Sequence, residues 1–194
     1  MVGQIGPLVQ VGRKKLALAF HVLGGVAGGA AIGLVLGFAG LLLRAALGER
    51  LDTVFLVVVP ATLLYAAAVD LGVLNVRPIT WERQTPGDWP CSLGHYPGIF
   101  AWGFDLGLGI TTRIPYQTLL VLPLAALLAG DLATAVAITT VYGASRALAV
   151  VAAVVSTTGE DYAAACDAIQ SRVLPLKRLV GATALVIAAL IVIS

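Results

Sequence analysis

LALAFHVLGGVAGGAAIGLVLGFAGLLL, residues 16–43, decides the fold class of this chain. The run contains no charged residue and no proline, and its one polar ring is His21. A bilayer core about 30 Å thick requires roughly 20 apolar residues per helix, so this run is long enough to cross it. Arg13, Lys14 and Lys15 precede the run, but a cleavable signal has an apolar core of only roughly 7–15 residues. The sequence therefore predicts a first transmembrane helix that is retained as a signal anchor.

Glycines recur at every fourth position of this run. Gly25, Gly29, Gly33 and Gly37 fall on one row of the expected helix. In lipid, where apolar side chains gain nothing from leaving water, rows of small residues let helices approach one another closely. The row predicts helix packing, within this chain or against a partner subunit, and a lipid or substrate groove is the alternative.

The rest of the chain has the same apolar character. Of its 194 residues, 59% are hydrophobic and 11% are charged, and the mean hydropathy is +0.98. A soluble domain carries roughly 25% charged residues. A net charge of +2 is too small to indicate a nucleic-acid partner. We expect a single all-α membrane domain over residues 1–194, a bundle of about five transmembrane helices at about 16–43, 54–74, 99–129, 132–156 and 179–193.

Two segments depart from simple spanning helices. Within 99–129, Thr111, Thr112 and Arg113 are preceded by glycines and followed by Pro115, which removes a backbone donor. This pattern predicts a kinked third helix, or alternatively two half-helices. Residues 158–173 begin with a capping-box pattern and place apolar and charged residues on opposite faces, which predicts a helix lying in the cytoplasmic interface.

Orientation follows from the positions of the basic residues. Five spans place only Arg44 and Arg50 on one side of the membrane. The other side collects Arg13, Lys14, Lys15, Arg77, Arg83, Arg172, Lys177 and Arg178. The positive-inside rule predicts that this second side is cytoplasmic, in a multi-pass protein of the cell membrane with its N-terminus in the cytoplasm. If the third stretch is a pair of half-helices, the C-terminus moves inside.

Four ionisable residues fall inside the predicted spans: Asp70, Asp105, Arg113 and Arg146. Each costs roughly 2.5–3.5 kcal/mol at the centre of a membrane helix, so each requires a compensating interaction. Asp70 with Arg146, or Asp105 with Arg146, are the expected cross-helix pairs. Such pairs either fix the helix register or line a substrate or proton path at the broken helix.

GFDLGLGITTRIPY at 103–116, followed by YGASRAL at 142–148, resembles the transmembrane thiol-disulfide relay proteins of cytochrome c biogenesis. That family belongs with the lysine-exporter-like transporters. In it, a Gly-Leu-Gly stretch leads into a Pro-Cys pair, whereas this chain has Thr112-Arg113 at the matching place and no Pro-Cys in its first span. The resemblance implies a retained scaffold without the dithiol chemistry, which leaves substrate passage or partner binding.

No motif for nucleotide binding, hydrolysis or metal binding occurs, so we expect neither an enzyme nor a resident cofactor or metal. The first functional hypothesis is a small transporter that moves a small anionic solute or protons through a site at the broken helix. The expected site residues are Asp70, Asp105, Thr111, Thr112, Arg113, Tyr142 and Arg146.

Two other functions compete with transport. The chain is alternatively a non-catalytic subunit or assembly factor of a larger membrane complex, with copies of itself or other membrane subunits as partners. A third hypothesis is a thiol relay through Cys91 and Cys166, although the expected topology places both in the reducing cytoplasm.

Overall fold

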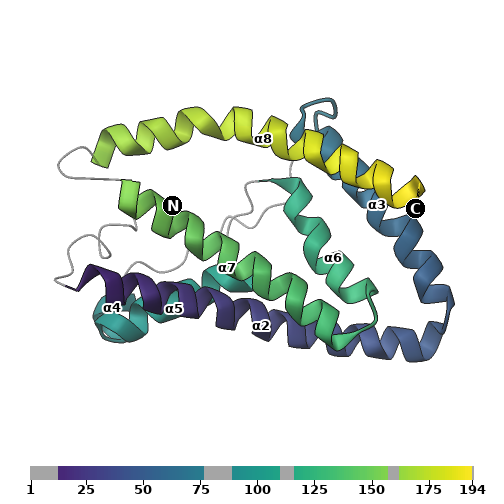
Figure 1. Cartoon of the computed structure of the whole chain (residues 1–194), viewed down its shortest axis with the longest axis horizontal. Coiled ribbons are helices and arrows are strands. Elements are labelled where there is room, and N and C mark those ends of the chain that lie inside the picture. Colours follow the sequence, from purple (N-terminus) through teal and green to yellow (C-terminus); the bar gives the residue numbers. More distant parts are fainter. Residues whose placement is uncertain (1–12, 77–88, 110–115, 157–161, 194) are drawn as a thin grey trace. The chain divides into compact units, whose positions relative to one another are not determined.

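The computed structural model describes residues 13–76, 89–109, 116–156 and 162–193, with side chains given except at 90–91, 156–174 and 191–193. Every regular element in these ranges is helical, which confirms the all-α prediction. The elements are α2 (Lys14–Leu47), α3 (Arg50–Asp70), α4 (Trp89–Ser92), α5 (His95–Leu108), η2 (Gln117–Leu120), α6 (Val121–Leu128), α7 (Leu132–Ser156) and α8 (Tyr162–Ile193) (Figure 1).

Three helices of the described chain are long and apolar enough to cross a membrane: α2, α3 and α7, the last over Leu132–Val155. This supports a membrane protein, while the count of about five spans stays a prediction. The bounds of α7 coincide with the predicted fourth span. Helix α2 extends beyond the predicted first span at both ends, because Lys14, Lys15 and Arg44 are good helix formers that allow the helix to continue.

The third apolar stretch is divided between two helices rather than forming one kinked helix. Helix α5 ends at Leu108, and Gly109 follows it in a left-handed conformation with φ 73°. This is a common way for a helix to stop, and only glycine adopts it without strain. The next described helix begins at Gln117, where η2 runs directly into α6. The described residues thus contain two short helices in this stretch, while their arrangement as half-helices in the membrane stays a prediction.

The C-terminal region also differs from the prediction. The interfacial helix expected at 158–173 and the last span expected at 179–193 are parts of one helix, α8, which continues through Pro175. A proline inside a helix removes one backbone hydrogen bond but does not necessarily end the helix in a membrane protein. The predicted boundary between these two elements was therefore wrong.

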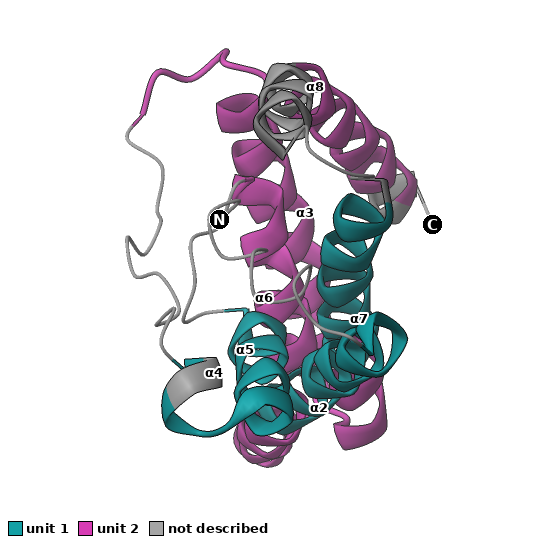
Figure 2. Ribbon diagram, turned by 90° about the vertical axis from the view of Figure 1, so that its left-hand side faces the viewer, with its two compact units in different colours: residues 1–32, 81–113, 139–170 teal, residues 33–80, 114–138, 171–194 magenta. Residues whose placement is uncertain are grey.

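The described residues form two compact units, each assembled from three separate parts of the chain (Figure 2). Unit 1 contains residues 1–32, 81–113 and 139–170, and unit 2 contains residues 33–80, 114–138 and 171–194. The core of unit 1 centres on Ala17, Ile99 and Val154. The core of unit 2 joins α3, α6 and α8 through Leu51, Val59, Leu63, Ala66, Ala67, Val121, Leu128, Ala184 and Ala188.

Glycines determine how closely the helices of unit 1 pack. A Cβ atom added to Gly107 of α5 would lie 2.2 Å from the backbone oxygen of Gly25, and one added to Gly143 of α7 would lie 2.3 Å from the same oxygen. Real Cβ atoms do not come this close, so α5 and α7 both meet α2 backbone to backbone at Gly25. Gly24 and Gly28 contact the backbone of α5 in the same way. We call this three-helix contact the glycine junction.

The glycine row predicted on the first helix therefore packs against another helix of the same chain. Gly25 and Gly29 face α7 in unit 1, and in unit 2 Gly37 faces Leu132 and Ala135 of the same helix. Gly33 is buried. Side chains at the covered positions would separate the helices, which is the packing role that rows of small residues serve in lipid.

The tight turn before α7 is closed by a side-chain cap. Gly130 takes a positive φ of 63°, and the Asp131 carboxylate accepts a 2.7 Å hydrogen bond from the backbone N–H of Thr134. Hydrogen bonds from Thr134 to this carboxylate lower the pKa of Asp131 below its ordinary value. An ionised aspartate at a helix N-terminus satisfies one of the free backbone donors there, which fixes where α7 begins.

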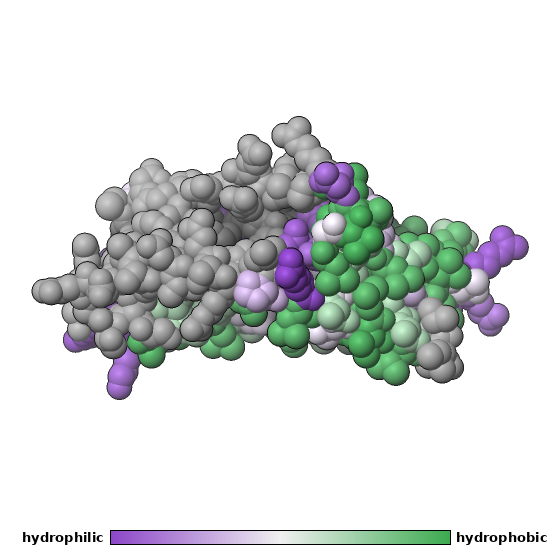
Figure 3. Space-filling view, turned by 90° about the horizontal axis from the view of Figure 1, so that it is seen from above, coloured by the Kyte–Doolittle hydropathy of each residue, from purple (hydrophilic) through white to green (hydrophobic). Residues whose placement is uncertain are grey.

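Large apolar side chains remain exposed on unit 2. On α3 they include Leu56, Val57 and Leu64, and on α8 they include Leu179, Val186 and Leu190. Figure 3 shows hydrophobic side chains gathered over this part of the molecule. Such a surface would be costly in water, whereas it is the ordinary outer surface of a helix that faces lipid.

Candidate functional site

The interruption between α5 and η2 is the centre of the site that the sequence predicted. Three of the predicted residues, Thr111, Thr112 and Arg113, lie in 110–115, outside the described residues. The described chain on either side is short: α5 has 14 residues, and the apolar helix Gln117–Leu128 follows the gap. At 1.5 Å per residue neither reaches the roughly 30 Å of a bilayer core.

Tyr142 and Arg146 of α7 lie at the end of α5. A Cβ added to Gly109 would come within 2.4 Å of Cε1 of Tyr142, so the tyrosine ring covers the residue that terminates α5. Tyr142 is buried, with 9% of its surface exposed. Arg146 donates a 3.0 Å hydrogen bond from Nη1 to the Tyr142 hydroxyl, and its Cζ lies 5.6 Å from the centre of the tyrosine ring. The two predicted site residues are thus direct partners.

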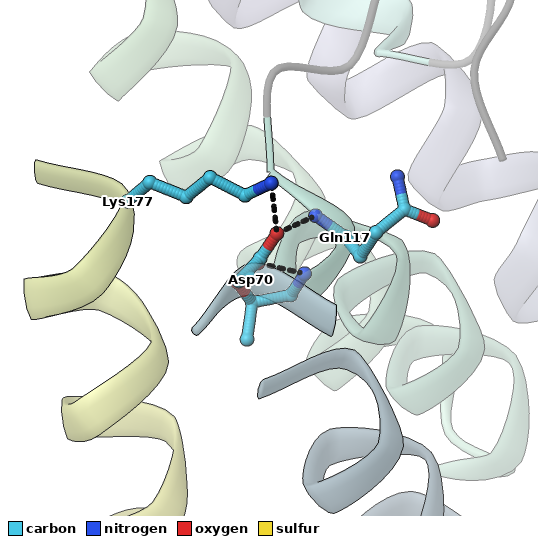
Figure 4. A network of polar contacts seen from close by, with 4 residues as sticks. Asp70, Gln117 and Lys177 are labelled. Atoms are coloured by element: carbon cyan, nitrogen blue, oxygen red, sulfur yellow. Dashed lines mark hydrogen bonds and ion pairs between the residues drawn. The ribbon is translucent and has the colours of Figure 1, made fainter. Parts of the chain in front are cut away.

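Asp70 forms a separate polar network in unit 2 (Figure 4). Its carboxylate accepts hydrogen bonds of 3.0 Å from the backbone N–H groups of Gln117 and Thr118, and another from the Thr118 hydroxyl. The Lys177 ammonium of α8 lies 3.8 Å from the same carboxylate, whose side chain is fully buried. We call these four residues the Asp70 network.

The Asp70 network joins the ends of two helices. Asp70 is the last residue of α3, where the negative end of the helix dipole disfavours a carboxylate. The free N–H groups at the start of η2 and the charge of Lys177 compensate for this, because both favour a negative group. The network therefore attaches the start of η2 and α6 to the end of α3 and to α8.

The cross-helix ion pairs expected from the sequence are not the ones observed. Among the described residues, ion pairs join Asp70 to Lys177 and Arg44 to Asp52. Arg146 instead has the Tyr142 hydroxyl as its partner and no carboxylate within ion-pair distance in the described part of the chain. Asp105 is buried in α5, with 5% of its surface exposed, and it has an interaction partner.

Sequence reasoning missed the partners of Asp70. Gln117 and Thr118 act mainly through backbone N–H groups, which every residue but proline has, so no residue type marks them. The sequence assigned Lys177 only to the basic residues that indicate the cytoplasmic side of the membrane. Its position before the last apolar run was the available signal, because a lysine beside such a run is able to reach a charged helix end.

His21 is a second buried polar residue of unit 1. It is fully buried on α2, and its ring centroid lies 4.6 Å from that of Trp102 of α5. Among the described residues, neither ring nitrogen has a hydrogen-bond partner of good geometry. The imidazole thus packs against an aromatic ring close to the glycine junction.

Comparison with known proteins adds no assignment. No protein-family model, curated protein or solved structure matches this chain. The resemblance to the thiol-disulfide relay proteins therefore stays a prediction, and the function must be inferred from the site itself. In the described part of the chain, no three His, Cys, Asp or Glu side chains lie together in a group able to hold a metal ion.

Proposed function

We propose that this chain is a small transporter-like integral membrane protein that moves a small anionic solute or protons through a site at the broken helix. The observation that supports this most strongly is the division of the apolar stretch 99–129 into α5 and the η2–α6 helix. Non-helical backbone is costly in lipid unless it is buried in protein or lines a water-filled cavity. Discontinuous helices of this kind form substrate and ion sites in many secondary transporters.

Charged residues within long apolar helices support the same function. Arg146 and Asp70, both predicted as site residues, lie in helices that are long and apolar enough to span a membrane. Charged residues at such positions cost several kcal/mol and commonly mark ion or substrate pathways. In this proposal the protein resides in the cell membrane with its N-terminus in the cytoplasm, as its basic residues indicate.

Transport by the purified protein tests the proposal. We expect proteoliposomes to take up radiolabelled phosphate or succinate, or to move protons detected by an internal pH-sensitive dye, faster than protein-free liposomes. Arg113→Ala should reduce this flux to the protein-free level while the variant still inserts, because Arg113 is the cation expected at the interruption. Arg50→Ala, which changes the exposed first residue of α3, is the matched control.

Two results would contradict the proposal. One is the absence of any flux of these anions or of protons with a stably reconstituted wild-type protein. The other is full retention of flux in Arg113→Ala. Isolation of the chain from membranes in a stoichiometric complex, without flux of its own, would favour the competing role as a non-catalytic subunit.

A further inference from the structure

Arg146 carries a charge in the middle of an apolar helix. It lies 14 residues after the start of α7 and 10 residues before its end. At 1.5 Å per residue these separations are about 21 Å and 15 Å, which places the Cα of Arg146 well inside a bilayer core about 30 Å thick. A cation at such a depth requires a neutralising partner, and the described residues supply no carboxylate to Arg146.

The Arg146 side chain does not extend toward the nearer end of α7. A long basic side chain near the end of a membrane helix usually extends toward the nearer interface, where water and lipid phosphates solvate its charge. The nearer end of α7 is Ser156, yet the guanidinium of Arg146 is turned one helical turn the other way, onto the Tyr142 hydroxyl. The charge therefore lies beside Tyr142, whose ring covers Gly109 at the end of α5.

The donors at this position match an oxyanion. A guanidinium has five N–H donors, and the described residues engage one of those of Arg146, through the Tyr142 hydroxyl. The Tyr142 hydroxyl accepts from Arg146, so its own proton is available for donation to another group. Guanidinium groups bind carboxylates and phosphates with two parallel hydrogen bonds, and these charge-assisted bonds are roughly twice as strong as neutral ones.

We propose that Arg146 and Tyr142 form a binding site for an oxyanion, a carboxylate or a phosphate group, at the end of α5. The bound group supplies the negative charge that the described residues do not provide to Arg146. The identification of this oxyanion with the transported solute rests on the proposed function, whereas anion binding at Arg146 does not depend on it. The positive-φ residue Gly109 contributes by lacking a side chain, which would fill the position that the Tyr142 ring takes.

Anion-dependent stability of the purified protein tests the site. The protein, stripped of lipid in a non-ionic detergent, is heated in sodium acetate, sodium phosphate or sodium chloride at equal ionic strength. Acetate or phosphate should raise the Tm above that in chloride in a saturable manner. Arg146→Gln should abolish this rise, Arg146→Lys should weaken binding at least about tenfold because the paired donors are lost, and Tyr142→Phe should weaken it less.

A control variant and a measurement on the wild-type protein make the test of the anion site informative even if the Arg146 variants do not fold. Arg50→Gln removes an exposed arginine and should leave the anion effect unchanged. If the Arg146 variants do not fold, protection of the wild-type Arg146 from phenylglyoxal, measured by mass spectrometry with and without phosphate, replaces them. Protection of Arg146 by phosphate supports the site, and equal modification in phosphate and chloride overturns it.

The outcomes separate the site from the transport function. If neither acetate, phosphate nor added phosphatidylglycerol stabilises the wild-type protein, the site is wrong. Stabilisation by phosphatidylglycerol alone, lost in Arg146→Gln, supports the site with a lipid phosphate as its occupant. Anion binding without flux contradicts only the proposed transport. Flux that is unchanged in Arg146→Gln contradicts the site as the solute-binding position and leaves transport standing.

Discussion

Gly143→Leu should lower the stability of the protein strongly. The added side chain would meet the backbone oxygen of Gly25, only 2.3 Å from the position of the new Cβ, and backbone atoms cannot move aside without separating α7 from α2. We expect the free energy of unfolding to fall by about 3 kcal/mol. For a chain of this size this corresponds to a decrease in Tm of about 6–12 °C, measured by thermal denaturation in detergent.

Ala149→Leu is the matched control, because Ala149 is exposed on the same helix. It should change the Tm by no more than about 1–2 °C, as expected for a surface position. Gly107→Leu, on the α5 side of the same contact, should repeat the effect of Gly143→Leu. Equal Tm values for Gly143→Leu and Ala149→Leu would show that the glycine junction does not hold these three helices together.

Asp70→Ala should release the start of η2. The substitution leaves the N–H groups of Gln117 and Thr118 without their acceptor and the Lys177 ammonium without its counter-ion. Removing one member of a buried, hydrogen-bonded ion pair costs about 3–5 kcal/mol. We expect hydrogen exchange at the Gln117 and Thr118 amides, measured by mass spectrometry of the peptide that contains them, to accelerate strongly, together with a lower Tm.

Asp52→Ala supplies the comparison. Asp52 pairs with Arg44 at 2.6 Å, but both side chains are about half exposed, 58% and 43%, so the loss of this pair should cost only about 0–1 kcal/mol. It should leave exchange at Gln117 and Thr118 unchanged. If Asp70→Ala also leaves exchange at these two amides unchanged, the Asp70 network does not hold η2 in place.

The sequence was sufficient for the fold class because uncharged apolar runs as long as residues 16–43 are typical of membrane helices and rare in soluble domains. The bounds of α7 were predicted correctly, since Gly130 and Asp131 are a clear turn and helix start. The joined helix α8 was not predicted, because Pro175 and the charged residues around it are typical of a boundary as well as of a continuous helix. Gly103 and Gly107 are among the glycines that precede Thr111 in the predicted kink, and their four-residue spacing also indicated a packing surface for α2.

The candidate site was predicted in part. Asp70, Tyr142 and Arg146 were chosen because polar groups inside apolar runs are costly, and two of them proved to be hydrogen-bonded to each other. The i, i+4 spacing of Tyr142 and Arg146 was a sufficient signal for that contact. The real partners of Asp70 had no such signal, because the helix that supplies two of its donors starts 47 residues later and contributes backbone groups.

We propose that the chain is interrupted within the membrane and that water or solute reaches the interruption. Single cysteines at Tyr116, which directly precedes η2, and at Val141, exposed on α7, test this in a protein with Cys91 and Cys166 replaced by serine. The measurement is the rate of labelling by a membrane-impermeant maleimide in sealed vesicles of either orientation. We predict that Tyr116→Cys is labelled and Val141→Cys is protected by lipid. Protection of Tyr116→Cys from both sides of the membrane, equal to that of Val141→Cys, would contradict the claim.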